Sequence, residues 1–365
     1  MKKHLFFVGK KFKFNTSLHE YIMREVEEKI TNVDSIHYFN DSDKSLFLQL
    51  EQIVTTPCQL IIITNRNSFS VVGKLLSTIT QDNQVLQDKM LIPSQTTLYE
   101  DNTYLLEHQG ALINVMQVVE GEYLPQILVG EDNPSALIQV FEEDIQSSSA
   151  LLEPLAQTFE VKLDFTQVVE GWLILHIESN RYGNISKFID AAKQLMSKNI
   201  ITASNICTYI IEKLRTANKK ISFAESCTGG ILASKFTQIS GASTVFDGSL
   251  VTYSNQLKSA WLAVEDAALE ENGAVSAEVV AQMSEGALNV SYADYAISVS
   301  GIAGPDGGSV EKPVGTVYIS VRSKTAEKTQ HLALRGDRNY VQDQSAFYAI
   351  KMLLLLDKDL FFKNI

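Results

Sequence analysis

Runs of apolar residues alternate with amphipathic stretches along the chain, and this pattern predicts strands that alternate with helices. Near the N-terminus, residues 5–8 and 60–64 are short apolar runs, typical of strands buried in a parallel sheet. Residues 17–29 between them have helical periodicity, with Ser17 as a candidate N-cap. Further strand-like residues follow near 112–119. The first part of the chain therefore predicts a β-α-β unit.

The pattern changes near residue 133. Strands are predicted at 136–141 and 173–177, and helices at 149–159 and 185–196. The short length of this segment predicts a small middle α/β domain.

A third region begins near residue 201 with a helix predicted at 204–216. Further strands are predicted at 221–224, 250–253, 295–300, 317–321 and 331–334, the last two as an antiparallel pair, and helices at 228–238, 276–289 and 340–356. This order is typical of a three-layer α/β/α domain. We therefore expect an α/β protein of three domains, at 1–132, 133–200 and 201–365.

Composition supports this division and excludes several classes of protein. A chain of 365 residues that is 45% apolar is long enough for two or three cores, and it is too apolar for intrinsic disorder. The net charge of -12 argues against binding to nucleic acid or to an anionic membrane. Residues 201–365 carry 15 basic and 17 acidic side chains, so the acidity lies mostly in residues 1–200. A nearly neutral third domain can bind a phosphorylated substrate.

Cysteine usage and the N-terminus predict a cytoplasmic protein. Cys58, Cys207 and Cys227 are far apart and form no C-x-x-C pair, which argues against a disulfide framework or a zinc site. The apolar core within residues 1–11 is too short for a signal peptide.

The strongest candidate for chemistry is the segment Ala-Glu-Ser-Cys-Thr-Gly-Gly at 224–230, between a predicted strand and a predicted helix. A hydroxyl at such an elbow is exposed, and the free N–H groups of the first helical turn attract an anion. The segment fits acyl transfer, with Ser226 attacking a carbonyl and N–H groups at 228–230 stabilising the oxyanion. Plain helix capping and a phosphate cradle are alternative interpretations, although the P-loop spacing is absent.

A base for Ser226 is the next requirement. His331 is the one histidine of the third region and lies on a predicted strand, so a Ser-His-Asp triad has little support. The segment 251–258 places Tyr253 at a strand end and Lys258 on the following turn. A buried lysine with a lowered pKa can act as a base, whereas a solvated helix lysine cannot.

Two further segments contain residues suited to a ligand. Four glycines lie within residues 301–308, and they form either a backbone N–H surface for a phosphate or carboxamide, or a surface turn. Arg338 precedes the last predicted helix and can contact a phosphate or pair with Asp337.

Read together, these segments resemble the CinA C-terminal domain, the family of nicotinamide-nucleotide amidohydrolases. The motifs occur in the family's order between residues 224 and 338: Ala-Glu-Ser-Cys-Thr-Gly-Gly at 224–230, Val-Thr-Tyr-Ser-Asn at 251–255, Gly-Ala-Val-Ser at 273–276, the glycine loop at 300–308, Lys-Pro-Val-Gly-Thr at 312–316 and Gly-Asp-Arg at 336–338.

The resemblance implies hydrolysis of the carboxamide of nicotinamide mononucleotide (NMN) to nicotinate mononucleotide and ammonia, without metal or cofactor, in pyridine nucleotide salvage. It implies Ser226 as nucleophile, Lys258 as its base and Tyr253 as a hydrogen-bonding support. The family commonly has a basic residue one turn into the last helix, where this chain has Gln342. The expected substrate contacts are Glu225, Thr228, Gly229, Gly230, Asn255, Gly301, Gly304, Asp306 and Arg338.

The first domain resembles the molybdopterin-binding-like domain of full-length CinA proteins in its position and β-α-β pattern. The family's glycine-rich loop falls at residues 64–69, which read Thr-Asn-Arg-Asn-Ser-Phe. Without those glycines the backbone cannot approach a pyrophosphate closely, so we expect a scaffold or a homodimerisation domain. The alternatives are an ADP-ribose-type nucleotide pyrophosphatase in this domain, or a non-catalytic protein that senses nucleotides or binds partners.

Overall fold

The computed structural model describes residues 1–30, 32–130, 134–179 and 182–363. Contacts divide the chain into two compact units, Met1–Pro134 and Ser135–Ile365. The second unit contains both the middle and the C-terminal segments expected from the sequence, and each of these has its own sheet. The chain is a mixed α/β protein, as the alternating pattern predicts. Within the described ranges, none of the helices has the length and apolar character that a bilayer span requires.

The first unit is built on a six-stranded sheet in the order β2-β1-β3-β8-β7-β6. The strands β2, β1, β3 and β8 run parallel, whereas β7 and β6 are antiparallel. The elements of this unit are β1 (Lys2–Val8), α1 (Lys11–Phe14), α2 (Thr16–Lys29), β2 (Ser35–Phe39), α3 (Ser45–Ile53), β3 (Cys58–Thr64), α4 (Arg66–Ile79), β4 (Gln84–Gln87), β5 (Met90–Pro93), β6 (Thr96–Glu100), β7 (Thr103–His108) and β8 (Ala111–Gln117).

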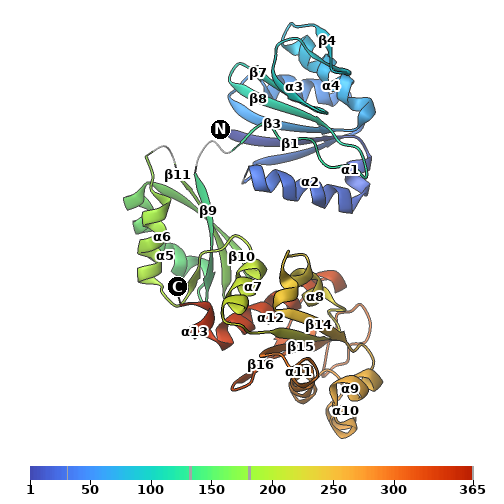
Figure 1. Cartoon of the computed structure of the whole chain (residues 1–365), viewed down its shortest axis with the longest axis vertical. Helices are drawn as coiled ribbons and strands as arrows, with labels where there is room; N and C mark the ends of the chain where they lie inside the picture. The colour runs from blue at the N-terminus through green and yellow to red at the C-terminus, as the bar shows by residue number, and fades with distance from the viewer. Residues whose placement is uncertain (31, 131–133, 180–181, 364–365) are drawn as a thin grey trace. The chain divides into compact units, whose positions relative to one another are not determined.

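Both faces of this sheet are covered, which explains the continuous apolar runs of its central strands. Alternate residues of β1 point to opposite sides: Phe6 packs with α3 and α4, and Leu5 and Phe7 pack with α2. Figure 1 shows α2 on one side of the sheet and α3 and α4 on the other. The sequence predicted the parallel pair of β1 and β3 and the helix between them.

Asparagine side chains start two of these helices. Asn15 accepts a hydrogen bond from the Leu18 N–H and caps α2, so the expectation of Ser17 as the cap is wrong. Asn65 caps α4 by accepting from the N–H groups of Asn67 and Ser68 at 2.9 Å. At the position of the family's glycine-rich loop, the Asn65 side chain therefore satisfies two backbone N–H donors at the start of α4.

The second unit begins with a four-stranded antiparallel sheet in the order β10-β11-β9-β12. Its core contains Ile138, Leu152, Leu175 and Phe188, so two helices pack on this sheet. Its elements are β9 (Ser135–Phe141), α5 (Ile145–Phe159), β10 (Val161–Val169), β11 (Trp172–Ser179), α6 (Ile185–Leu195) and β12 (Ile200–Ile201).

One end of this small sheet packs into the core of the C-terminal region. Phe141, Val169 and Trp172 belong to the same apolar cluster as helix α12 (Arg338–Leu356). The Trp172 ring lies 5.8 Å from the ring of Phe347, in an edge-on arrangement. This shared core explains why the two sheets form one compact unit.

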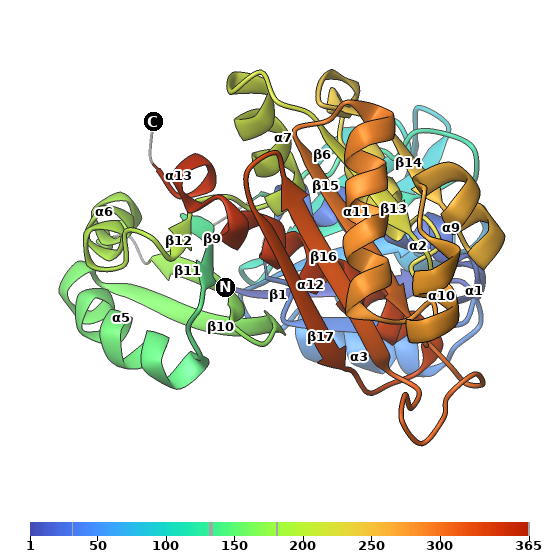
Figure 2. The same ribbon diagram turned by 90° about the horizontal axis from the view of Figure 1, so that it is seen from below.

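The C-terminal sheet has the order β14-β13-β15-β16-β17, with parallel pairs β13–β14 and β13–β15 and antiparallel pairs β15–β16 and β16–β17. Figure 2 shows α11 in front of this sheet and α12 behind it, which is the expected three-layer arrangement. The remaining elements are α7 (Ile206–Thr216), β13 (Ile221–Glu225), α8 (Ile231–Thr237), the 3-10 turn η1 (Ala242–Thr244), β14 (Phe246–Val251), α9 (Asn255–Leu262), α10 (Asp266–Asn272), α11 (Ala277–Ser291), β15 (Tyr295–Gly301), β16 (Thr316–Ser323), β17 (Glu327–Ala333) and α13 (Lys358–Phe361).

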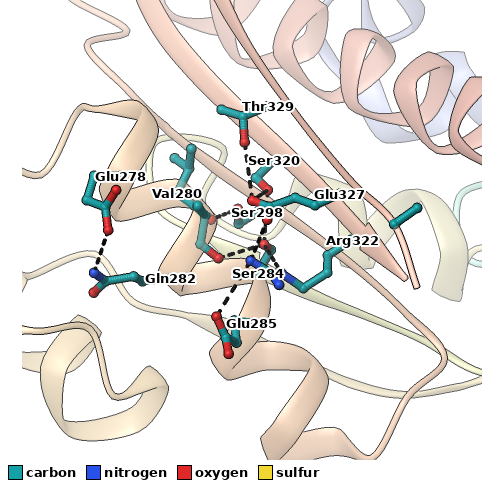
Figure 3. A network of polar contacts seen from close by, with 12 residues as sticks. Glu278, Val280, Gln282, Ser284, Glu285, Ser298, Ser320, Arg322, Glu327 and Thr329 are labelled. Atoms are coloured by element: carbon teal, nitrogen blue, oxygen red, sulfur yellow. Dashed lines mark hydrogen bonds and ion pairs between the residues drawn. The ribbon is translucent and has the colours of Figure 1, made fainter. Parts of the chain in front are cut away.

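A polar network fixes α11 on the sheet (Figure 3). The Ser298 hydroxyl donates to the carbonyl of Val280 at 2.5 Å, and the hydroxyls of Ser284 and Ser320 lie 3.0 Å apart. The Arg322 guanidinium extends the network by donating to the Ser284 hydroxyl at 3.4 Å and to the Glu327 carboxylate at 2.7 Å. Buried hydroxyls that find partners in this way hold a helix in one register.

Helix α11 also fixes the position of α9, which carries Lys258. A Cβ atom on Gly286 would lie 2.1 Å from the carbonyl oxygen of Leu262, at the end of α9. The two helices can therefore approach this closely only because residue 286 has no side chain. Leu262 and Met283 share one apolar cluster at this contact.

Candidate active site

Ser226 lies at a sharp turn between β13 and α8. Its N–H donates to the carbonyl of Val299 on the neighbouring strand at 3.0 Å, which anchors the turn to the sheet. Gly229 and Gly230 follow with φ values of 61° and 106°, in the left-handed region that glycine adopts most readily. The chain therefore reverses within a few residues. Ser226 lies directly after the carboxyl end of β13 and is 7% exposed.

Lys258 is buried beside Ser226, with only 1% of its surface exposed. Its Nζ lies 3.1 Å from the Ser226 Oγ, 2.8 Å from the carbonyl oxygen of Thr252 and 3.4 Å from that of Tyr253. Burial lowers the pKa of Lys258, because a low-dielectric environment disfavours its charged form. A neutral amine here can donate its two N–H groups to the carbonyls and direct its lone pair at the serine hydroxyl.

The expectation that Lys258 lies on a turn is wrong. Strand β14 ends at Val251, and Ser254 then caps α9 by accepting from the Leu257 N–H. Lys258 thus lies one turn into a helix, on the side that faces the sheet. The helix fixes its side chain more firmly than a turn would.

Arg338, the first residue of α12, joins two walls of the site. Its guanidinium donates to the Tyr253 hydroxyl at 2.9 Å and to the carbonyl of Gly304 at 2.8 Å. Tyr253 is 62% exposed, so it lies at the rim of the site. The guanidinium has five donors, and those that remain are available to a ligand.

The residues of the elbow, α9, the glycine loop and α12 enclose one cavity of about 260 Å³. Eight of the residues singled out in the sequence line it: Ser226, Tyr253, Asn255, Lys258, Gly301, Gly304, Asp306 and Arg338. The other lining residues are Cys227, Ala274, Val275, Ser300, Ile302, Ala303 and Gly307.

Four predicted contacts, Glu225, Thr228, Gly229 and Gly230, are not among the lining residues. The carboxylate of Glu225 is fully buried and accepts from three N–H groups at the start of α8, at 3.0 to 3.1 Å, and from the Ser249 hydroxyl at 3.2 Å. It therefore caps the helix.

The same contacts correct the expected oxyanion donors. The Gly230 N–H donates to Glu225 and the Gly229 N–H donates to the carbonyl of Ser226, so neither is available. Among the residues that the structure describes, the N–H groups of Cys227 and Thr228 donate to no backbone carbonyl. Of the three expected donors, only the Thr228 N–H stays a candidate, and the Cys227 N–H, which was not expected, is the other.

In the sequence, Gln342 was noted only because it stands where the family commonly has a basic residue. Its side-chain amide donates to the carbonyl of Cys227 at 2.6 Å and connects α12 to the elbow. The spacing of four residues from Arg338 places both side chains on one face of the helix, which is the only sequence signal for this contact.

Cys227 is unsuited to nucleophilic attack. Its side chain is 4% exposed, and burial raises the pKa of its thiol to about 12. The thiol is therefore protonated near neutral pH. In the described ranges, no group of three or more His, Cys, Asp or Glu side chains is arranged to hold a metal ion.

Comparisons with known proteins match the region of the chain that contains this cavity. A family model described as the CinA C-terminal domain matches residues 203–356. A "CinA-like protein" of Thermotoga maritima is 34% identical over 268 residues, which covers 68% of this chain and 64% of that protein. This chain therefore spans slightly less than two thirds of the length of that relative.

A shorter relative matches the C-terminal region alone. The "Nicotinamide-nucleotide amidohydrolase PncC" of Escherichia coli strain K12 is 45% identical over 143 residues, which covers 39% of this chain and 87% of that protein. Among solved structures, "competence/damage inducible protein CihA" from Agrobacterium tumefaciens is 36% identical, with a TM-score of 0.41, and the match covers 43% of this chain and 98% of that one.

Proposed function

Because this chain belongs to the CinA family, we propose that its C-terminal domain hydrolyses the carboxamide of NMN to nicotinate mononucleotide and ammonia. One observation carries the reaction type: the buried Lys258 amine lies 3.1 Å from the Ser226 hydroxyl inside a cavity. The relative named nicotinamide-nucleotide amidohydrolase supports the choice of substrate.

In the first half of the proposed reaction, the Ser226 Oγ attacks the carboxamide carbon while its proton passes to the neutral Lys258 amine. The carbonyl oxygen becomes an oxyanion, which the N–H groups of Cys227 and Thr228 stabilise. Lys258 then gives its proton to the amide nitrogen. The C–N bond breaks, ammonia leaves, and the acyl group stays on Ser226 as an ester.

In the second half, water attacks the ester. Lys258 takes one proton from the water and returns it to the Ser226 oxygen, so the enzyme regains its starting state. The product leaves as a carboxylic acid, which gives its remaining proton to solvent, where the released ammonia takes one up. Each proton transfer at the reacting atoms goes through Lys258, and no further base is required there. The burial that lowers the pKa of Lys258 makes this exchange feasible near neutral pH.

The rim of the cavity suits the rest of a mononucleotide. Arg338 presents a half-buried guanidinium whose remaining donors match a phosphate. Asp306 and Asn255 lie at the same cavity and offer polar groups to the ribose hydroxyls. Homodimer formation and a cytoplasmic location remain predictions.

An ammonia-release assay tests the proposal. The purified full chain should release ammonia and nicotinate mononucleotide from NMN, and it should act more slowly on nicotinamide and nicotinamide riboside, which lack the phosphate. The measurement is coupled ammonia detection with chromatographic identification of the product. Faster release from the riboside than from NMN would reject the substrate, and no release from any of the three amides would reject the activity. Cleavage of ADP-ribose in a parallel reaction would instead support the alternative for the first unit.

Gln342 should act by positioning the elbow. Its replacement by glutamate keeps the shape of the side chain but removes the donor to Cys227, and we expect kcat to fall about three- to tenfold with little change in KM, because one hydrogen bond is lost. The matched control is Gln344→Glu, since Gln344 donates instead to Val168 in the small sheet. A rise in KM without a loss of kcat would mean that Gln342 contacts substrate.

A further inference from the structure

A second cavity, of about 460 Å³, lies in the second unit where α6, β12 and α7 meet. It shares no lining residue with the cavity at Ser226 and is the larger of the two. Its volume is within the usual range for small-molecule sites. It is lined by Lys193, Ile200, Ile201, Thr202, Tyr209, Glu212, Lys213, Arg215 and Thr216.

Three cations from two helices line this cavity, against a single carboxylate, that of Glu212. Lys193 comes from α6, and Lys213 and Arg215 come from α7. None of the three forms an ion pair with a carboxylate in the part of the chain that the structure describes. By contrast, Lys220, just beyond α7, lies 2.6 Å from Asp247. The Lys213 ammonium does donate to the carbonyl of Lys363 at 2.8 Å, which leaves its charge uncompensated. In a chain with 43 acidic and 31 basic side chains, three cations without an ion pair around one cavity are unexpected.

Helix ends account for only part of this charge. The three cations lie in the last turns of their helices, where each helix contributes roughly half a negative charge. The exposed carboxylate of Glu212 adds one full negative charge. About one positive charge remains, which matches a phosphate monoester better than a polyphosphate. Burial also lowers the pKa of Lys213, so its ammonium gains from an anion beside it.

The other lining residues suit a flat ring. Ile200 and Ile201 are buried and form an apolar floor. The hydroxyl of Tyr209 donates to the carbonyl of Phe361 at 2.5 Å, and this bond fixes the orientation of its ring at the cavity. The Lys213 ammonium lies over this ring, 5.4 Å from its centroid, so the ring brings a cation and an aromatic surface for a nucleobase to the same place.

We propose that this cavity binds a nucleoside monophosphate, with its phosphate on Lys193, Lys213 and Arg215 and its base against Tyr209 and Ile200. The site is independent of the amidohydrolase reaction. Since Tyr209 and Ile200 make no base-specific hydrogen bond, purine and pyrimidine nucleotides should bind with similar affinity.

Calorimetric titration of the full chain tests this site. AMP and UMP should both bind, and adenosine or inorganic phosphate alone should bind at least tenfold more weakly. Lys193→Gln combined with Arg215→Gln should weaken AMP binding about tenfold or more, since two charge-assisted contacts are lost. Neither residue makes a side-chain hydrogen bond within the described ranges, so the thermal unfolding of this variant should match that of the parent.

The matched control is Lys187→Gln combined with Lys198→Gln, which removes the same charge from exposed positions in the same region outside the cavity. Equal loss of AMP affinity in both double variants would overturn the site in favour of a general charge effect. Unchanged affinity in the cavity variant, with a loss in Arg338→Ala, would place AMP in the catalytic cavity instead. No binding of AMP and UMP at millimolar concentrations, or equal binding of adenosine, would also overturn it.

Discussion

Replacing Lys258 by arginine should lower the rate of ammonia release from NMN roughly 10²–10⁴-fold, the range that a general base contributes. Arginine keeps donors toward Thr252 and Tyr253, but its guanidinium stays protonated at every accessible pH, whereas the lysine amine can be neutral. It therefore cannot accept the proton of Ser226. The measurement is kcat by coupled ammonia detection, beside circular dichroism to show that the variant is folded.

The pH dependence of the parent enzyme gives the same prediction a second readout. Only the neutral amine of Lys258 can take a proton, and burial lowers its pKa in the folded enzyme. The value of kcat should therefore rise with pH and reach its plateau below the ordinary lysine pKa of 10.5. A plateau reached only above that pH, or an arginine variant that keeps its activity, would remove Lys258 from the role of base. Lys351→Arg is the control, since its amine donates to the backbone carbonyl of Glu170, in the turn between β10 and β11.

The outline of the site could be predicted from the sequence because its signals are local. Glycines after a strand mark the elbow at 226–230 and the loop at 301–308, and the apolar runs locate the strands that end beside them. Ser226 and Lys258 thus became candidates before any contact was known. Both line one cavity, although they lie 32 residues apart.

What the sequence did not reveal depends on contacts between distant segments. Helix α9 is short and its start depends on one serine cap, so residues 255–262 have too little periodicity to predict it. Glu225 was expected at the substrate from the family resemblance, yet its carboxylate accepts from N–H groups at the start of α8. The role of Gln342 depends on the approach of α12 to a carbonyl 115 residues away.

Ser226→Ala should remove nearly all turnover, roughly 10³-fold or more, because the covalent route loses its nucleophile and only binding and oxyanion stabilisation remain. The change deletes one oxygen at a residue that is anchored through its backbone N–H, so the fold should persist. Initial rates of ammonia release measure the loss. Denaturant-quenched reactions of the parent, analysed by mass spectrometry, should show an acyl adduct on Ser226 that the variant lacks.

Cys227→Ala is the matched control for this nucleophile. It removes the neighbouring side chain but keeps the backbone carbonyl that Gln342 holds, and we expect a loss of at most about tenfold, in line with a small change in packing. Full activity in Ser226→Ala together with loss in Cys227→Ala would move the attack to the thiol, despite a pKa raised to about 12. Full activity in both variants would mean that water attacks the carboxamide directly. In that case Lys258 would remain the base, and no acyl adduct would form.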